Sequence, residues 1–264
     1  MAPASLSVVI PAYNEEQRLP ALLAALERDL ERLAEQAGMG LLEAILVDDG
    51  STDRTAELIR GFDGLPGRLS LIQLSSNRGK GAAVKAGMLV ARGERALMTD
   101  ADMSTPLEDI VSLAAALDTG YDLAIGSRAL PDSRVLVHQP RVRELMGKAF
   151  NLLLRLVTGI PWRDTQCGFK LFRLETTRAL FEAQQIEGFA FDAEICLRAR
   201  SLGLKLAEVP VHWSNDSATH VQLGRSSLQM GIDILRIRRI VGNTIEPDSS
   251  VSVAPGGLAR DENS

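Results

Sequence analysis

Residues 6–16 read Leu6-Ser7-Val8-Val9-Ile10-Pro11-Ala12-Tyr13-Asn14-Glu15-Glu16, an apolar run that ends in a polar turn. Leucines then recur at helical spacing from Glu15 to Glu35. A strand, a polar loop and a helix in this order form the repeating unit of a mostly parallel sheet with helices on both faces. The opening of the chain therefore predicts an α/β fold.

The same unit recurs along the first half of the chain. Four further apolar runs are expected as strands, and each leads into a polar motif or a helix: Glu43–Val47, Leu69–Leu74, Ala96–Thr99 and Asp122–Ile125. In open α/β sheets, ligands bind beyond the carboxyl ends of the strands. We therefore expect the polar motifs that follow the strands to meet at one edge of the sheet.

Composition excludes several classes of protein. The 264 residues carry 29 Lys and Arg against 34 Asp and Glu, a net charge of −5, which argues against a nucleic-acid partner. The two cysteines, Cys167 and Cys196, lack a CxxC spacing and favour a reducing, cytoplasmic compartment. The first residues, Met-Ala-Pro-Ala-Ser-Leu, do not form a signal peptide, and no apolar run reaches 18 residues, so we expect no spanning helix.

We expect one domain over residues 1–242, with two functional halves at 1–128 and 129–242. The second half begins with a loop and a long helix, Arg141–Thr158. The tail at 243–264 has too few apolar residues to pack and is expected to be disordered.

The strongest local signal is Asp100-Ala101-Asp102, which directly follows an apolar strand. Residues i and i+2 of an extended chain point the same way, so Asp100 and Asp102 can converge on one cation. Carboxylate oxygens favour Mg²⁺ or Mn²⁺. The structural alternative is that both aspartates only cap the loop before the next helix.

A second acidic pair, Asp48-Asp49, ends the second strand, and side-chain alternation lets only one of the two face the ligand edge. Arg78, Lys80 and Arg128 each stand beside glycine or serine and are candidate partners for an anion. Gly79-Lys80-Gly81 opens a helix in the manner of a phosphate-binding helix start. The alternative is that Lys80 is simply solvated.

Taken together, these motifs resemble the nucleotide-sugar half of inverting family 2 glycosyltransferases with the GT-A fold. The downstream motifs are similar to those of dolichyl-phosphate β-glucosyltransferases and bacterial polyprenyl-phosphate relatives. The residues that carry the likeness are Pro11–Glu15, Val47–Asp53, Asn77–Gly81, Thr99–Asp102, Gly126–Arg128, Asp164–Phe172 and Gly188–Ile195. Unlike the eukaryotic enzymes, this chain is expected to have no N-terminal transmembrane anchor, and it has Met103-Ser104 where dolichyl-phosphate mannosyltransferases have Leu-Gln.

The resemblance implies a C-terminal acceptor-side extension of the GT-A fold and a set of site residues. It places Asp100 and Asp102 at the metal, with Asp102 as the direct ligand. Arg128 would stabilise the leaving diphosphate, and Asp192 lies where relatives with hydroxyl acceptors place a base; here an orienting or plain structural role is expected. Arg128 and one of Arg141 or Arg143 would hold the acceptor phosphate. The donor-binding residues would be Pro11, Ala12, Tyr13, Glu15, Asp48, Asp49, Arg78, Lys80 (near the base or ribose), Asp100 and Ala101.

The implied reaction is metal-dependent, inverting transfer of a hexose, glucose from UDP-glucose, onto a polyprenyl or dolichyl phosphate. Alternatives within the family are a GDP-mannose donor or a saccharide hydroxyl acceptor. Three alternatives lie outside the family. They are a nucleotidyltransferase, a haloacid-dehalogenase-type phosphatase with Asp100 as nucleophile, and a binding module without turnover.

The helix Arg141–Thr158 has a basic polar sector and a wide apolar face. Such a helix either packs on the domain core or lies in the headgroup layer of a membrane. A second helix, Ser226–Val241, could assist. We expect peripheral association with the cytoplasmic face of the membrane.

Overall fold

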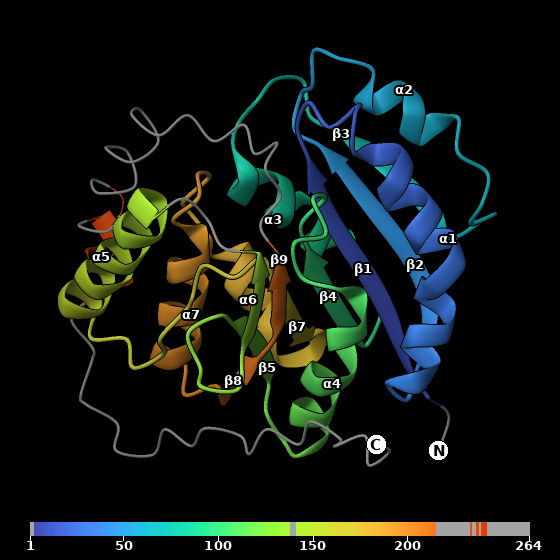
Figure 1. The fold of residues 1–264 in the computed structure, drawn as a ribbon. Helices are drawn as coiled ribbons and strands as arrows, with labels where there is room; N and C mark the ends of the chain where they lie inside the picture. The colour runs from blue at the N-terminus through green and yellow to red at the C-terminus, as the bar shows by residue number, and fades with distance from the viewer. Residues whose placement is uncertain (1–2, 138–140, 215–232, 234–235, 238, 242–264) are drawn as a thin grey trace.

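The computed structural model describes residues 3–137, 141–214, 233, 236–237 and 239–241. Within these ranges, residues 141–146 and 148–150 are described by their backbone alone. Seven strands form one sheet in the order β3-β2-β1-β4-β7-β5-β8 (Figure 1). All neighbours in this sheet are parallel except β7, which runs antiparallel to both β4 and β5. The strands are β1 (Ala4–Ala12), β2 (Met39–Asp48), β3 (Leu69–Gln73), β4 (Arg95–Thr99), β5 (Leu123–Ser127), β7 (Phe169–Arg173) and β8 (Leu206–Pro210).

Helices cover both faces of this sheet, as the sequence predicts, and a second sheet pairs β6 (Arg134–Val137) with β9 (His212–Ser214) in parallel. The helices are α1 (Leu19–Gln36), α2 (Thr55–Arg60), α3 (Lys80–Val90), the 3₁₀ turn η1 (Leu107–Asp109), α4 (Ile110–Asp118), α5 (Arg141–Thr158), α6 (Leu174–Glu182) and α7 (Phe191–Ser201). The predicted α/β class is confirmed.

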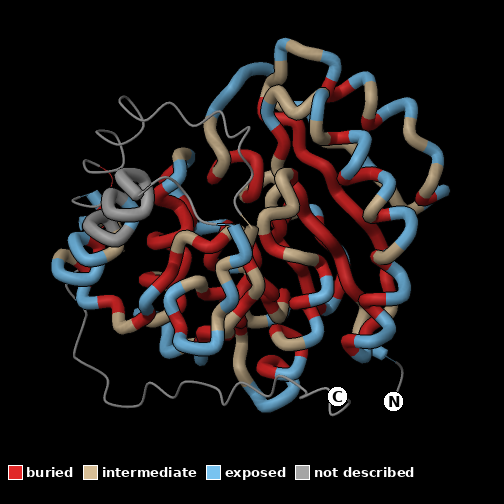
Figure 2. The backbone as a smooth tube through the Cα atoms, viewed as in Figure 1, coloured by how far each residue is buried: buried red, intermediate tan, exposed pale blue. Residues whose placement is uncertain are grey.

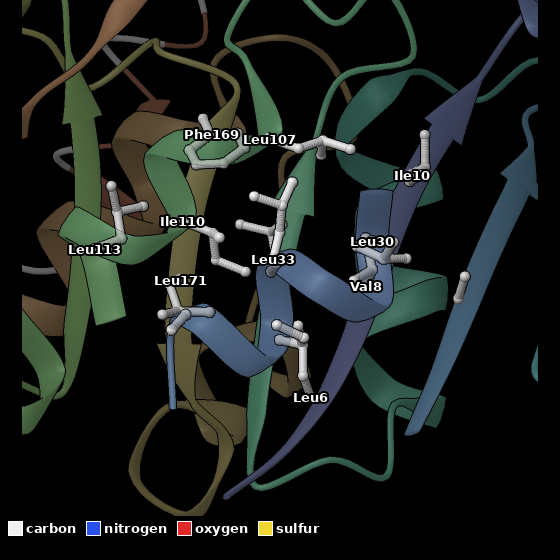
Figure 3. Close-up of a cluster of buried hydrophobic side chains, with 14 of the residues drawn as sticks. Leu6, Val8, Ile10, Leu30, Leu33, Leu107, Ile110, Leu113, Phe169 and Leu171 are labelled. Carbon is white, nitrogen blue, oxygen red and sulfur yellow. The ribbon is translucent and has the colours of Figure 1, made fainter. Parts of the chain in front are cut away.

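Strand alternation divides the apolar core into two layers. Val8 and Ile10 of β1 point toward α1 and α4, where they meet leucines such as Leu30 and Leu33 (Figure 3). Val9 points to the opposite face, toward the layer that α3, α6 and α7 cover. Because every residue of β4 and β5 and most residues of β1, β2, β7 and β8 are buried, the middle of the sheet is held firmly, and only the edge strand β3 has no buried residue.

Some element boundaries differ from expectation. The first helix begins at Leu19 rather than Glu15 because residues 15–18 form a separate turn. The Glu15 N–H donates to Thr55 Oγ1 at 2.8 Å and the Glu16 N–H to Asp53 Oδ2 at 3.1 Å, so this turn is fixed to the loop after β2. The second strand begins at Met39, four residues before the predicted start.

The two expected halves of the chain share the main sheet. Strand β7, from the second half, lies between β4 and β5, both from the first half. The single domain over 1–242 stays a prediction, and the expected disordered tail at 243–264 lies outside the described residues, as does most of the expected helix Ser226–Val241.

No helix within the described ranges is both long enough and apolar enough to cross a bilayer.

A buried carboxylate ties the first strands together at the end of the sheet away from the motifs. Glu43 accepts hydrogen bonds from Ser7 Oγ at 2.8 Å, from the Arg92 N–H at 2.8 Å and from Arg92 Nη2 at 2.7 Å. Burial opposes the charge of Glu43, but the hydrogen bonds from Arg92 and Ser7 outweigh it and hold the pKa below its ordinary value.

We expect Glu43→Gln to lower the free energy of unfolding at neutral pH by about 1–3 kcal/mol, because charged hydrogen bonds are lost. The pKa of Glu43 is lower in the folded protein than in the unfolded chain, so its stabilisation is complete above about pH 4.3 and is lost as the pH falls through the folded value. Urea denaturation of both proteins across this range should show the difference shrink in acid. A difference that is constant with pH would contradict the assignment; Glu31→Gln, in an exposed pair with Arg68, is the control.

Candidate functional site

The polar motifs meet at the carboxyl edge of the sheet. Asp48 ends β2, Asp100 and Arg128 directly follow β4 and β5, and Lys80 begins α3. Because β7 is antiparallel, its first residues reach the same edge, so Lys170 joins the group. Asp192 arrives from the start of α7.

Asp100 and Asp102 lie together beside Lys80. Lys80 Nζ is 2.6 Å from Asp100 Oδ1, and the Ser104 N–H donates to Asp102 Oδ1 at 2.9 Å. Burial and the charge of Asp100 raise the pKa of Asp102. Burial lowers the pKa of Lys80, but Asp100, Asp192 and Asp102 overcome this and raise it. Lys80 therefore contacts a carboxylate in this structure, and its expected position near the base or ribose stays a prediction.

The backbone around Asp100 is shaped to receive it. A Cβ placed on Gly168 would lie 1.8 Å from Asp100 Oδ2, so a larger residue there would push the Asp100 carboxylate out of its present place. Met103 adopts φ +48, a left-handed conformation that costs a residue with a side chain about 1 kcal/mol. Both features bring the Asp100-Ala101-Asp102 turn against the loop before β7.

That loop also holds Arg128. Asp164 is buried and accepts from Arg128 Nε at 2.7 Å, from Arg128 Nη2 at 3.0 Å and from the Arg128 N–H at 3.0 Å. The Arg128 guanidinium carbon also lies 5.4 Å from the centre of the Trp213 ring. Burial disfavours the charge, but Asp164 dominates and, with a contribution from Asp100, raises the pKa of Arg128. Arg128 thus shares one charged cluster with the metal-candidate aspartates.

A second buried ion pair was not expected from the sequence. Lys170 Nζ contacts Asp192 Oδ1 and donates to the Cys167 carbonyl, and both side chains are buried. Burial raises the pKa of Asp192, while the positive charges of Lys170 and Lys80 oppose the rise. The signal was present in Phe169-Lys170-Leu171-Phe172, where a lysine stands between large apolar residues.

The second acidic pair supports two loops. Asp48 and Asp49 are both buried. Asp48 accepts from the Ser51 N–H at 2.9 Å and from Gln73 Nε2 at 3.0 Å, while Asp49 accepts from the N–H groups of Arg78 and Gly79 at 2.8 and 2.7 Å. Burial raises the pKa of Asp49 against these bonds. Asp49 therefore fixes the start of the loop that leads into α3.

The remaining donor candidates lie along this edge. Tyr13 is 42% exposed beyond β1, and Glu15 pairs with Arg18 at 2.9 Å. Arg78 is exposed and pairs with Glu187. Ala12 and Ala101 are buried and Pro11 is half-buried, at the end of β1 and just beyond β4.

The side chains of Arg141 and Arg143 lie outside the described residues, although α5 itself is the helix that the sequence predicts. Their expected role at an acceptor phosphate stays a prediction.

The donor set of the site fits a hard divalent cation. Asp100 and Asp102 are both partly buried and supply only carboxylate oxygens, and their mutual repulsion is what a dication relieves. Within the part of the chain that the structure describes, no group of three or more His, Cys, Asp or Glu is arranged to hold a metal. Two carboxylates with substrate phosphates and water are a usual shell for Mg²⁺.

The fold and the site define a glycosyltransferase of the GT-A class. The model of the family described as "Glycosyl transferase family 2" matches residues 7–181, and the chain belongs to this family.

Two curated relatives are similar over most of their length. The chain is 38% identical to "Dolichyl-phosphate beta-glucosyltransferase" of Dictyostelium discoideum over 88% of this chain and 73% of that protein. It is 39% identical to "Dolichyl-phosphate beta-glucosyltransferase" of Drosophila melanogaster over 90% of this chain and 76% of that protein. The expected family is confirmed, and the phosphatase and nucleotidyltransferase alternatives are set aside.

A solved structure shares the fold. Glucosyl-3-phosphoglycerate synthase of Mycobacterium tuberculosis, in complex with Mn²⁺, UDP-glucose and glycerol 3-phosphate, aligns with a TM-score of 0.63 and 20% identity. The alignment covers 95% of this chain and 83% of that one. The GT-A fold expected from the sequence is thereby confirmed.

We expect Lys170→Met to lower the free energy of unfolding by about 3–5 kcal/mol, because it leaves the buried Asp192 carboxylate without its cation partner. The double variant Lys170→Met with Asp192→Asn should be more stable than the sum of the two single effects predicts. Each single variant leaves one buried charge without its partner, whereas the double variant removes both charges. Urea denaturation measures all three.

Strict additivity would contradict the buried pair. The exposed pair Arg54 and Glu57 serves as control, where the same cycle should give about 0.5 kcal/mol or less.

Proposed function

We propose that the chain transfers glucose from UDP-glucose to a polyprenyl or dolichyl phosphate, with inversion at the anomeric carbon. The observation that carries the proposal is the cluster in which Asp100 and Asp102 lie beside Lys80 and share their surroundings with Arg128. In this cluster the two aspartates can bind a metal cation, while Lys80 and Arg128 supply positive charge for the phosphate groups of the substrates. The relatives at 38% and 39% identity are named dolichyl-phosphate beta-glucosyltransferases, which supports glucose as the sugar and a dolichyl phosphate as the acceptor.

The donor binds, in this proposal, between the loops after β1, β2 and β4. Tyr13 and Glu15 lie at the nucleoside end, with Asp49 supporting the loop that carries Arg78 and leads to Lys80. Pro11, Ala12 and Ala101 form the floor. Because Lys80 faces Asp100, we place its ammonium on the diphosphate rather than on the base.

Mg²⁺ or Mn²⁺ is the proposed cofactor, held by Asp102 directly and by Asp100 directly or through water. The ion would offset the negative charge that develops on the leaving UDP. A similar fold has been solved with Mn²⁺ bound.

Arg128 is proposed to hold the acceptor phosphate, with Arg141 or Arg143 as a second cation. A phosphate monoester with a second pKa near 6 is largely dianionic at neutral pH, so its oxygen needs no general base. That oxygen attacks the anomeric carbon from the side opposite UDP, and the bond to the diphosphate breaks with its electron pair leaving on UDP. Asp192, which is ion-paired with Lys170, then serves to position charge rather than to accept a proton.

We expect the protein with Mg²⁺ and radiolabelled UDP-glucose to label a polyprenyl phosphate in the organic phase. Asp102→Asn should reduce the rate by about 10²-fold or more, in keeping with loss of a main electrostatic contributor. UDP-glucose and GDP-mannose are compared side by side. Failure of every nucleotide sugar to label the lipid would overturn the proposal, and full activity of Asp102→Asn would remove the metal role.

A lipid-linked acceptor suggests a membrane surface as partner, and α5 has exposed apolar residues that could contact it. Leu152, Leu153 and Leu156 of this helix are 56%, 48% and 74% exposed, while Leu154 is buried against the core. Figure 2 shows the second half of α5 largely exposed. One leucine of the apolar face thus packs on the core, and three others are exposed and free to meet a lipid surface. We propose that this exposed row lies in the headgroup layer, on the cytoplasmic face, which suits two free cysteines.

We expect Leu152→Gln with Leu156→Gln to weaken binding to vesicles of phosphatidylcholine and phosphatidylglycerol by at least about tenfold, since burying each leucine is worth about 1.5–3 kcal/mol. Vesicle flotation measures the effect. The matched control is Leu42→Gln, an exposed leucine on β2, far from α5 in Figure 1. Equal binding of the double variant and the control would contradict the surface.

A further inference from the structure

Two buried glutamates outside the proposed ligand contacts hold the two sides of the site. Glu208, on β8, is buried and has no ion-pair partner among the described residues. Its Oε1 accepts from the N–H groups of Arg163 and Asp164 at 2.9 and 2.8 Å. Burying a carboxylate is costly unless hydrogen bonds offset it, and here both bonds go to a single loop. The loop is the one from which Asp164 reaches Arg128.

The route from Glu208 to Arg128 is short and continuous. Asp164 binds the Arg128 side chain through both carboxylate oxygens and also accepts its backbone N–H. Trp213 covers a face of the guanidinium. A displacement of the Asp164 backbone would therefore move the cation that we propose for the acceptor phosphate.

Glu194, on α7, holds a second loop, which lies on the donor side of the site. It is fully buried, accepts from the Gln185 and Ile186 N–H groups at 2.9 and 2.7 Å, and pairs with Arg198 at 2.8 Å. The loop that it fixes packs against the start of α3. The Ala82 N–H donates to the Glu187 carbonyl at 3.1 Å, and Gln184 Nε2 donates to the Gly81 carbonyl at 2.9 Å.

Residues 79–81, at the start of α3, are packed very closely against residues 186–187. A Cβ on Gly79 would lie 2.5 Å from the Glu187 carbonyl oxygen, and one on Gly81 would lie 2.6 Å from that of Ile186. Lys80 stands between these two glycines, so its position depends on the loop that Glu194 holds.

We infer that Glu208 and Glu194 are positioning residues with separate duties: Glu208 sets the acceptor-phosphate side through Asp164 and Arg128, and Glu194 sets the donor-diphosphate side through residues 184–187 and Lys80. The assignment of the two sides rests on the proposed function. A merely structural role would lower stability without separating the two substrates.

The test measures binding directly, so that it does not depend on turnover. UDP with Mn²⁺ is titrated by calorimetry. Farnesyl phosphate is titrated by tryptophan fluorescence, for which Trp213 on Arg128 is a built-in reporter and Trp162 is the only other tryptophan. The variants are Glu208→Ala and Glu194→Ala, each with its glutamine counterpart, and thermal unfolding confirms that each is folded.

We expect Glu208→Ala to raise the dissociation constant for farnesyl phosphate by about tenfold, the size of one or two lost backbone hydrogen bonds, and to change that for UDP by less than about twofold. Glu194→Ala should show the reverse pattern. Glu208→Gln keeps an amide oxygen for both N–H groups and should recover most of the affinity for farnesyl phosphate. If an alanine variant does not fold, its glutamine variant decides, with a loss of about two- to threefold confined to the same ligand.

Equal losses for both ligands in one variant would overturn the inference for that glutamate, and so would no loss in a folded alanine variant or, where that variant does not fold, in its glutamine counterpart. A wild-type protein that binds farnesyl phosphate but transfers no glucose would refute the proposed function and leave the inference intact. A wild-type protein that does not bind farnesyl phosphate would overturn the acceptor half.

Discussion

Charges that are buried at one edge of the sheet must be balanced by neighbours, and this requirement organises the rest of the site. Lys170 meets Asp192, the charges of Asp192 and Lys80 act on each other, and Lys80 meets Asp100. A separate ion pair of Arg128 and Asp164 closes the group. An unbalanced charge at the buried Lys170, Asp192 or Asp164 would cost several kcal/mol, so these three side chains depend on their partners for their place.

The sheet supplies the rigidity that this balance needs. Parallel strands β1, β2, β4 and β5 bring their following loops to the same edge, and antiparallel β7 brings Lys170 there from its own beginning. Glycines permit the closest approaches, with Gly168 against Asp100 and Gly79 against the carbonyl of Glu187. Fixed charges of both signs in a firmly packed frame are suited to stabilising a developing diphosphate and a phosphate acceptor, because they need little reorganisation during the reaction.

Local patterns in the sequence predicted the first strands, the helices between them and the convergence of Asp100, Asp102, Lys80 and Arg128. These features depend on periodicity and on the general rule that ligands bind beyond the carboxyl ends of strands. The insertion of β7 between β4 and β5 could not be predicted in this way, because pairing between distant strands leaves no periodic mark. For the same reason the partners Asp164 for Arg128 and Lys170 for Asp192 were missed, although each lay in a motif that the sequence made conspicuous.

The shared cluster is tested most directly by a crystal structure of the protein with Mn²⁺ and UDP, in which anomalous scattering locates the metal. We expect one manganese peak at Asp102, on the side of Asp100 and Lys80, with the diphosphate bound to it and Arg128 still held by Asp164. Manganese bound away from both aspartates, or UDP bound on another face of the molecule, would contradict the central claim.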